Sequence, residues 1–120
     1  MNAMQALQSF WAGFGLPAYD ENTVPDNAEM PYITYESARG FFNNTVSMTA
    51  SLWYYSPSWA AISAKEEQIA DYITRGGRQI AFNGGALWIK RGNIWAQRMA
   101  DSADDMIRRI ILNLEVEYLV

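Results

Sequence analysis

The chain has 120 residues, of which 50% are hydrophobic and 14% aromatic, enough apolar material for one domain with its own core. It contains no cysteine and no histidine, which excludes disulfides, thiolate chemistry, Ser-His-Asp catalysis and the usual zinc sites. The net charge is −4 and the nine basic residues are scattered, so we expect no specific nucleic-acid binding. We predict a single domain spanning residues 1–120.

Membrane insertion and secretion are not expected either. The longest mostly apolar run, residues 10–17, is too short to cross a bilayer and contains glycines. The first five residues lack the basic start of a signal peptide. We therefore expect a protein that is made and kept in the cytoplasm, unless it leaves as part of a larger particle.

The N-terminal segment is predicted to be a short amphipathic helix over residues 2–14. Apolar side chains recur there every three or four residues, and Asn2 is placed to cap the first turn with Gln5 three residues on. Residues 16–30 then contain two prolines and several acidic and Asn residues, which predicts an extended loop. We interpret this loop as a contact arm, with disorder as the alternative.

Two antiparallel strands are predicted next. Residues 31–36 begin with a proline, where no ladder donor is needed, and residues 45–55 alternate cleanly between apolar and hydroxyl side chains. Residues 39–44 between them are predicted to form a turn, in which the pair Phe41 and Phe42 is a candidate anchor.

A second helix is predicted from Ser56 and Pro57, a capping hydroxyl followed by a proline at the first helical position, to about Thr74. Residues 78–82 and 86–90 are predicted to be short strands around Asn83 and Gly84, because Asn-Gly is a strong hairpin signal. Residues 91–93 are predicted to turn again, and residues 94–99 to form a further strand or extended segment.

The last fifteen residues, 106–120, are predicted to form one long strand. From Leu112 onward, apolar residues alternate with Asn113, Glu115 and Glu117, as expected of a strand with one buried and one wet face. Such a strand would reach roughly 45–50 Å, so it must bend or project past its own subunit. The predicted fold class is α+β, a mostly antiparallel sheet of four to six strands with two helices packed on one face.

Few residues of the sequence are candidates for catalysis or metal binding. Glu115 and Glu117 lie two apart on one strand face, within the range of a two-carboxylate glycosidase, but such alternation is more typical of a solvated or intersubunit face. A small hydrolase using this pair is the remote alternative. Asp101, Asp104 and Asp105 miss the calcium-loop pattern and are expected to form a turn. We expect no catalytic residue, no metal and no cofactor.

The composition instead favours interfaces. Seven arginines against two lysines, together with many aromatic residues, match the residue preferences of interface cores. Long strands with Arg on one part and Glu on another suit edge-to-edge pairing of identical subunits, which closes into a ring if the rotation allows. The alternatives are an ordinary monomer surface, or a monomeric module that binds a ligand in a tryptophan-lined groove.

Two segments resemble a known group of proteins. Residues 24–35, Val-Pro-Asp-Asn-Ala-Glu-Met-Pro-Tyr-Ile-Thr-Tyr, resemble the acidic loop and following strand of small tail-module proteins from long-tailed bacteriophages and prophages. Residues 94–99, followed by acidic residues and by residues 107–118, are similar to the same group. Chain length and element order match tail terminator, or tail completion, proteins.

This resemblance implies a structural role. Tail terminators form a ring, typically a hexamer, that caps the tail tube, ends its polymerisation and offers a surface for head–tail joining. The implied partners are further copies of the chain, the tail tube protein and the head–tail connector protein, and the implied location is the host cytoplasm during assembly and then the virion. A head-completion or connector adaptor protein of the phage neck is the alternative.

Interface residues follow from alternation, loop length and this analogy. Subunit contacts are predicted on the last strand and at one position before it, at Arg98, Arg108, Arg109, Glu115 and Glu117. The loop with Asp20, Glu21 and Asp26, and the hairpin tip with Asn83 and Gly84, are predicted to reach the tube or a neighbouring subunit.

Overall fold

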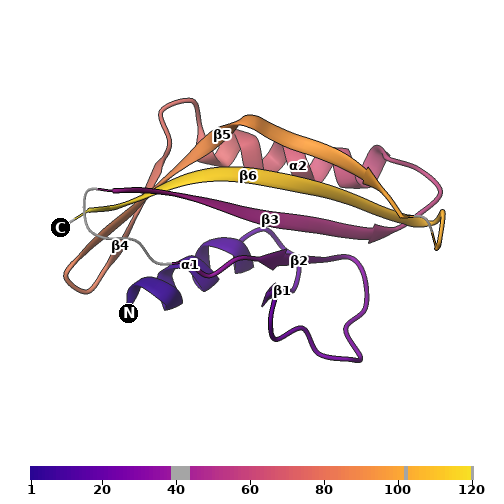
Figure 1. The fold of residues 1–120 in the computed structure, drawn as a ribbon, viewed down its shortest axis with the longest axis horizontal. Coiled ribbons are helices and arrows are strands. Elements are labelled where there is room, and N and C mark those ends of the chain that lie inside the picture. Colours follow the sequence, from indigo (N-terminus) through magenta and orange to yellow (C-terminus); the bar gives the residue numbers. More distant parts are fainter. Residues whose placement is uncertain (39–43, 102, 120) are drawn as a thin grey trace.

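The computed structural model describes residues 1–38, 44–101 and 103–119, which form two helices and one six-stranded sheet (Figure 1). All neighbouring strands pair antiparallel except the first two, which are parallel. Across the sheet the strands lie in the order β1 (Ala18–Asp20), β2 (Tyr32–Tyr35), β3 (Thr45–Tyr55), β6 (Ile107–Leu119), β5 (Gly85–Ala100) and β4 (Arg78–Phe82).

The last strand, β6, lies in the middle of the sheet. Its even-numbered side chains from Ile110 to Tyr118 are buried on one face, and its odd-numbered side chains are only half-buried on the other. Helices α1 (Ala3–Ala12) and α2 (Ala60–Ile73) contribute to the same core as these even-numbered residues. The predicted α+β class, with both helices on one face, is therefore confirmed.

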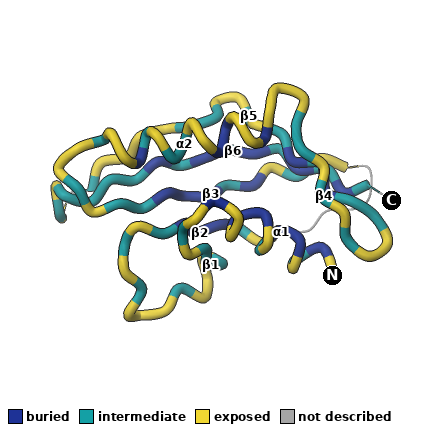
Figure 2. The backbone as a smooth tube through the Cα atoms, turned by 180° about the vertical axis from the view of Figure 1, so that it is seen from behind, coloured by how far each residue is buried: buried dark blue, intermediate teal, exposed yellow. Residues whose placement is uncertain are grey.

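The two helices also contact each other. Asn2 and Gln5 form the predicted capping box at the start of α1, and α1 ends at a Gly13 cap. Phe14 meets Tyr72 of α2 edge-on at 5.5 Å between ring centroids, and the Lys65 ammonium donates to the Phe14 carbonyl at 2.7 Å. Figure 2 shows buried residues along α1 and through the middle of β3 and β6. Neither helix is long and apolar enough to cross a membrane, within the residues described.

The predicted start of the second helix is wrong. α2 begins at Ala60 rather than at Pro57, and its N-cap residue Trp59 makes no side-chain capping bond. The hydroxyls of Ser56 and Ser58 accept hydrogen bonds from the amides two residues on, at 3.1 and 3.0 Å. These local turns compete with helix formation, which delays the helix by three residues.

The predicted turn at residues 91–93 is also wrong, because β5 runs on through it as one strand with a bulge. Arg91 is opposite Leu114 and Ala96 is opposite Leu112, so extra residues of β5 protrude between these two pairs. Gly92 makes this possible, since a Cβ at that position would lie 2.8 Å from the Asn113 carbonyl oxygen.

Strand β1 lies inside the segment predicted to be a loop. It has three residues and pairs in parallel with β2, and the flanking amides of Glu21 and Ile33 donate to the carbonyls of Tyr35 and Pro17. Three residues are too few for a period-two pattern to be recognised. The predicted contact arm is therefore shorter, residues 21–31. The candidate anchor Phe41–Phe42 lies outside the described residues.

The last strand does not project from the molecule. β3 pairs with it from Ile107 to Glu117 and β5 from Arg108 to Leu119, so both of its backbone edges are occupied. The longest dimension of the structure is 44 Å, which accommodates the strand. The expectation that this strand pairs edge-to-edge with a neighbouring subunit is therefore wrong, because a strand with two occupied edges has no free ladder of amides and carbonyls.

Gly92 provides a test of the bulge. We expect Gly92→Ala to lower the free energy of unfolding by about 1–3 kcal/mol, because the added methyl group forces the bulge away from β6. Gly76→Ala is the matched control, since a Cβ there meets no atom within 4 Å. Urea denaturation measures both. Equal stability of the two variants would contradict the close packing of the bulge.

Candidate functional site: an open strand edge and an aromatic row

One edge of the sheet is left bare. β4 pairs only with Gly85–Ile89 of β5, so residues 90–100 of β5 have β6 on one side and no strand of the described chain on the other. We call residues 90–100 the open edge. Ile94 and Met99 on it are 60% and 40% exposed. An unpaired edge with exposed apolar side chains is a template for another chain, and the bulge leaves residues 96–100 as its regular part.

Two predicted interface arginines are engaged within their own chain. The guanidinium groups of Arg98 and Arg108 lie 4.8 and 5.2 Å from the ring of Trp59 at the start of α2. Arg98 also donates to the Ser63 hydroxyl at 3.2 Å, and Arg108 to the Pro57 carbonyl at 2.9 Å. These contacts fasten α2 to the sheet. Arg98 remains exposed at the open edge, whereas Arg108 is half-buried.

Arg109 points to the opposite face, because neighbouring strand residues alternate. Its guanidinium lies 4.5 Å from the ring of Trp53, and its Nε donates to the Ser51 hydroxyl at 3.2 Å. Trp53 is followed by Tyr32 and then Tyr19, at 6.4 and 5.7 Å between centroids. We call Tyr19, Tyr32, Trp53 and Arg109 the aromatic row.

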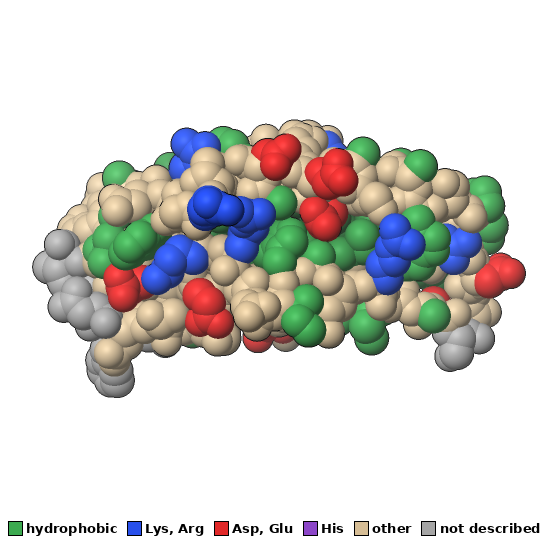
Figure 3. Space-filling model, turned by 90° about the horizontal axis from the view of Figure 1, so that it is seen from above, with side chains coloured by type: hydrophobic (Ala, Val, Ile, Leu, Met, Phe, Trp, Pro, Cys, Tyr) green, Lys and Arg blue, Asp and Glu red, His purple; other side chains and the backbone are tan. Residues whose placement is uncertain are grey.

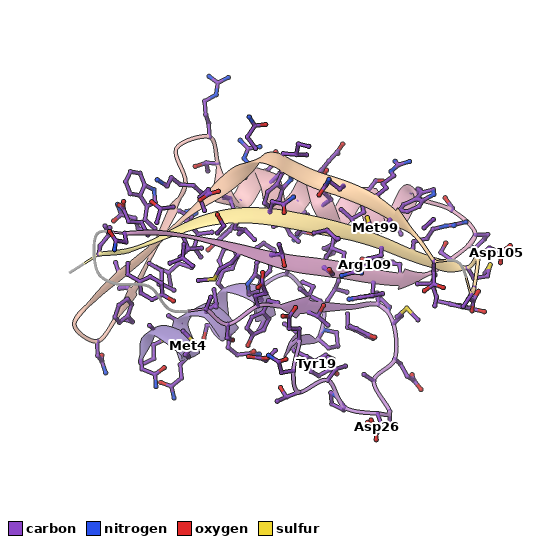
Figure 4. All side chains as sticks on the ribbon, in the orientation of Figure 1. Met4, Tyr19, Asp26, Met99, Asp105 and Arg109 are labelled. Carbon is purple, nitrogen blue, oxygen red and sulfur yellow. The ribbon has the colours of Figure 1, made fainter. Side chains whose placement is uncertain are left out.

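The aromatic row crosses the helix-free face and ends beside the open edge. Tyr32, Trp53, Arg109 and Met99 are opposite one another on successive strands, and Figure 4 labels Tyr19, Arg109 and Met99. A small cavity of about 80 Å³ lies among Trp53, Arg109 and Met99. The sequence placed these residues on strands but not in one row, because it does not give the register between strands.

Glu115 and Glu117 lie on the same helix-free face, towards the other end of β6. Glu115 accepts from the Ser47 hydroxyl at 3.2 Å and is opposite Lys90, while Glu117 is opposite Trp88. A groove of about 330 Å³ beside them is lined by Glu115 but not Glu117, along with Ser47, Thr49, Asn93, Gln97 and Asn113. The two carboxylates thus do not converge on one cleft, as two-carboxylate hydrolysis requires.

The acidic loop residues divide into two kinds. The Asp20 carboxylate accepts from the Ser37 hydroxyl at 2.5 Å and from the Asn22 amide at 2.9 Å. These bonds, the Ser37 bond most of all, hold the pKa of Asp20 below its ordinary value of 3.8. Asp20 therefore shapes the loop. Glu21 and Asp26 are exposed, and Asp26 lies where the loop projects furthest from the sheet (Figure 4).

Asn83 and Gly84 form the tip of the β4–β5 hairpin, as predicted. Gly84 has a φ of 95°, which only glycine adopts without strain, and both residues are exposed. The Asn83 amide donates to the Met1 carbonyl at 2.7 Å, which places the tip beside the N-terminus. The structure therefore divides the predicted interface residues among several surfaces, and it does not bring them together as one site.

Three further carboxylates have structural roles. Asp101 accepts from the amides of Ala103 and Asp104, and Asp104 accepts from the Met106 amide, so these residues form the expected turn. Glu36, which the sequence did not single out, accepts from both the amide and hydroxyl of Thr49 at 2.7 Å. It covers the edge of β3 where β2 ends. The described residues hold no group of three potential acidic metal ligands.

Comparisons with protein-family models, with curated proteins and with solved structures find no match to this chain. The strongest elements of the candidate site are the open edge and the aromatic row, which are suited to binding another macromolecule rather than to acid–base chemistry.

The Asp20–Ser37 bond predicts a pH effect. Because the folded-state pKa of Asp20 is lowered, its contribution to stability is present above the ordinary value and is lost as pH falls through the folded pKa. Ser37→Ala removes the largest cause. We expect the Asp20 carboxyl to titrate at higher pH in the variant, measured by NMR, and the stability gap from wild type to shrink on acidification below 3.8. An unchanged titration would contradict this assignment.

Proposed function

We propose that this chain is a virion structural protein of a long-tailed bacteriophage or prophage, a tail terminator. Copies form a ring, a hexamer by the resemblance, that caps the tail tube, ends its polymerisation and provides the surface for head–tail joining. The observation that carries the proposal is the open edge, which leaves a ladder of amides and carbonyls and two exposed apolar side chains without a partner in the described chain.

The arrangement of surfaces supports a repeating unit. A ring subunit needs two different surfaces for its two neighbours and a third for the structure on which the ring sits. The open edge lies at one side of the sheet, the β1–β2 loop lies at the other, and the helix-free face with the aromatic row lies between them (Figure 1). The tail tube protein and the head–tail connector protein are the proposed partners beyond the ring itself.

The role needs no chemistry. Assembly takes place in the host cytoplasm, and the protein then remains in the virion at the boundary of tail and neck. Neither a cofactor nor sequence-specific contact with nucleic acid is part of this proposal, and the net charge of −4 disfavours adhesion to DNA.

Deletion of the gene from a phage that encodes this chain tests the role. We expect tail tubes longer than wild type and without attached heads, because nothing stops tube polymerisation or presents the joining surface. Electron microscopy of the lysate measures tube length, and expression of the gene from a plasmid is the control. Tubes of normal length without heads would favour the neck adaptor. Normal tails joined to heads would contradict both roles.

Arg108 and Arg109 predict different outcomes because they lie on opposite faces. We expect Arg108→Gln to lower the free energy of unfolding by about 1–2 kcal/mol, since it loses Trp59 and the Pro57 carbonyl, while assembly at high concentration persists.

We expect Arg109→Gln to weaken capping of the tail tube more than it lowers stability, because it removes the cation from the aromatic row. Urea denaturation measures the stability, and tube length in the lysate of a phage that carries the variant measures capping. If the variant gave tubes of wild-type length, the aromatic row would not be a contact surface for the tube.

A further inference from the structure

The charges of this chain are separated between the two edges of the sheet. Residues 1–38 contain five carboxylates and no basic residue, whereas residues 78–100, which span β4 and β5, contain four basic residues and no carboxylate. The strand order β1-β2-β3-β6-β5-β4 places these segments at opposite edges. The acidic residues are Asp20, Glu21, Asp26, Glu29 and Glu36, and the basic residues are Arg78, Lys90, Arg91 and Arg98.

On the acidic side, the carboxylates without an internal role are in the loop. Asp20 and Glu36 are bonded to Ser37 and Thr49, but the side chains of the other three make no hydrogen bond or ion pair with the described chain. All three are exposed, at positions Glu21, Asp26 and Glu29. We call residues 21–30 the acidic loop.

On the basic side, the free charge is at the open edge. Arg78 lies over Tyr72 and donates to its carbonyl, and Arg98 is engaged with Trp59. Arg91 is exposed, and its guanidinium contacts no partner in the described chain. Lys90, its neighbour, lies over Trp88 on the helix-free face. By alternation Lys90 projects to the helix-free face and Arg91, opposite Leu114, to the helix side, so the two cations flank the backbone at the start of the open edge.

We propose that the open edge of one copy receives the acidic loop of a second copy. Opposite charge brings the loop to Lys90 and Arg91, and the exposed Ile94 and Met99 offer apolar surface further along the same edge. This contact rests on the proposed function only in taking the partner to be another copy of the chain. It joins two different surfaces, so it is head-to-tail, and repetition of a head-to-tail contact produces a ring when the rotation closes.

The approach of the loop is restricted by other carboxylates near this edge. Glu66 and Glu67 lie on α2, which packs against the helix side of β5, whereas Asp71 lines a cavity beside α1. Lys65 cannot offset them at the surface, because its ammonium is bonded to the Phe14 carbonyl and to Gln68. Like charges repel, so the loop docks in the plane of the sheet, against the backbone edge from which Lys90 and Arg91 project to the two faces.

The side of the molecule on which β5 and α2 lie, seen from above in Figure 3, is consistent with such a contact. Figure 3 shows hydrophobic side chains following one another along the middle of this surface, with Lys and Arg groups among them and Asp and Glu groups also present. The partner segment has the complementary composition. The acidic loop contains three free carboxylates, no cation, and the half-buried apolar residues Val24 and Met30.

Charge reversal at the two surfaces tests the contact. The edge variant is Arg91→Glu and the loop variant is Asp26→Lys with Glu29→Lys. We expect each to self-associate at least about tenfold more weakly than wild type, because like charges then face each other. An equal mixture of the two variants should recover association, since each copy then meets an opposite charge on both sides. Sedimentation velocity and native mass spectrometry measure the strength and the composition of the assemblies.

Matched controls carry the same charge changes elsewhere. Arg75→Glu matches the edge variant, and Asp71→Lys with Asp105→Lys matches the loop variant, all at exposed positions that the proposed contact does not use. Both controls should associate like wild type. Every variant should keep the wild-type fold, because the altered side chains make no hydrogen bond, ion pair or ring contact that holds the sheet together. Thermal unfolding of each variant checks this.

Three outcomes overturn the contact. The first is a wild-type chain that stays monomeric at about 1 mM, a concentration at which even weak specific contacts form. The others are charge-reversal variants that associate as strongly as wild type, and a mixture of the two variants that does not recover association. The tail role is judged separately by the gene deletion. If deletion gives overlong tubes while both variants associate normally, the loop-to-edge contact fails and the proposed function stands. If the mixture recovers but deletion leaves normal tails, the contact stands and the tail role fails.

Discussion

The structure depends on the alternation of β6, whose even-numbered side chains from Ile110 to Tyr118 are buried beneath both helices. Burial of a large aliphatic side chain contributes about 1.5–3 kcal/mol, so this one strand supplies a large share of the free energy that holds the layers together. A slip of one residue would send Glu115 and Glu117 into the core. The pairing of β6 with β3 and β5 is therefore fixed by the cost of burying charge.

This central position determines where surface remains. With both edges of β6 occupied, the ends of the sheet are the short β1 with its loop and the part of β5 that β4 does not reach. Each end differs from the other in charge, backbone exposure and shape, and a subunit with two unlike edges can assemble in one direction. The even-numbered residues of β6 hold the fold together, and the two unlike sheet edges are the surfaces through which we propose that the chain assembles.

Much of the fold follows from the sequence. Residues 45–55 were predicted as a strand and form β3 with those bounds, and the Asn83–Gly84 hairpin and the Asn2–Gln5 capping box are present. These features depend on neighbouring residues alone. The errors share a cause, since β1 and the bulge at Gly92 are set by contacts with distant strands. The helix does not begin at Ser56 and Pro57, because the hydroxyls of Ser56 and Ser58 accept hydrogen bonds from nearby amides in local turns.

The candidate site was less predictable, because it depends on the register between strands and on which face of the sheet each side chain occupies. Arg108 and Arg109 look equivalent in the sequence. Arg108, however, lies over Trp59 on the helix side of the sheet, and Arg109 lies over Trp53 on the helix-free face. The aromatic row exists only because Tyr32, Trp53 and Arg109 are in register on three strands that are far apart in the chain. Along the sequence the nine basic residues look scattered, although residues 1–38 contain no Lys or Arg. This separation of charge acquires meaning only with the strand order, which places that stretch and the basic open edge on opposite sides of one sheet.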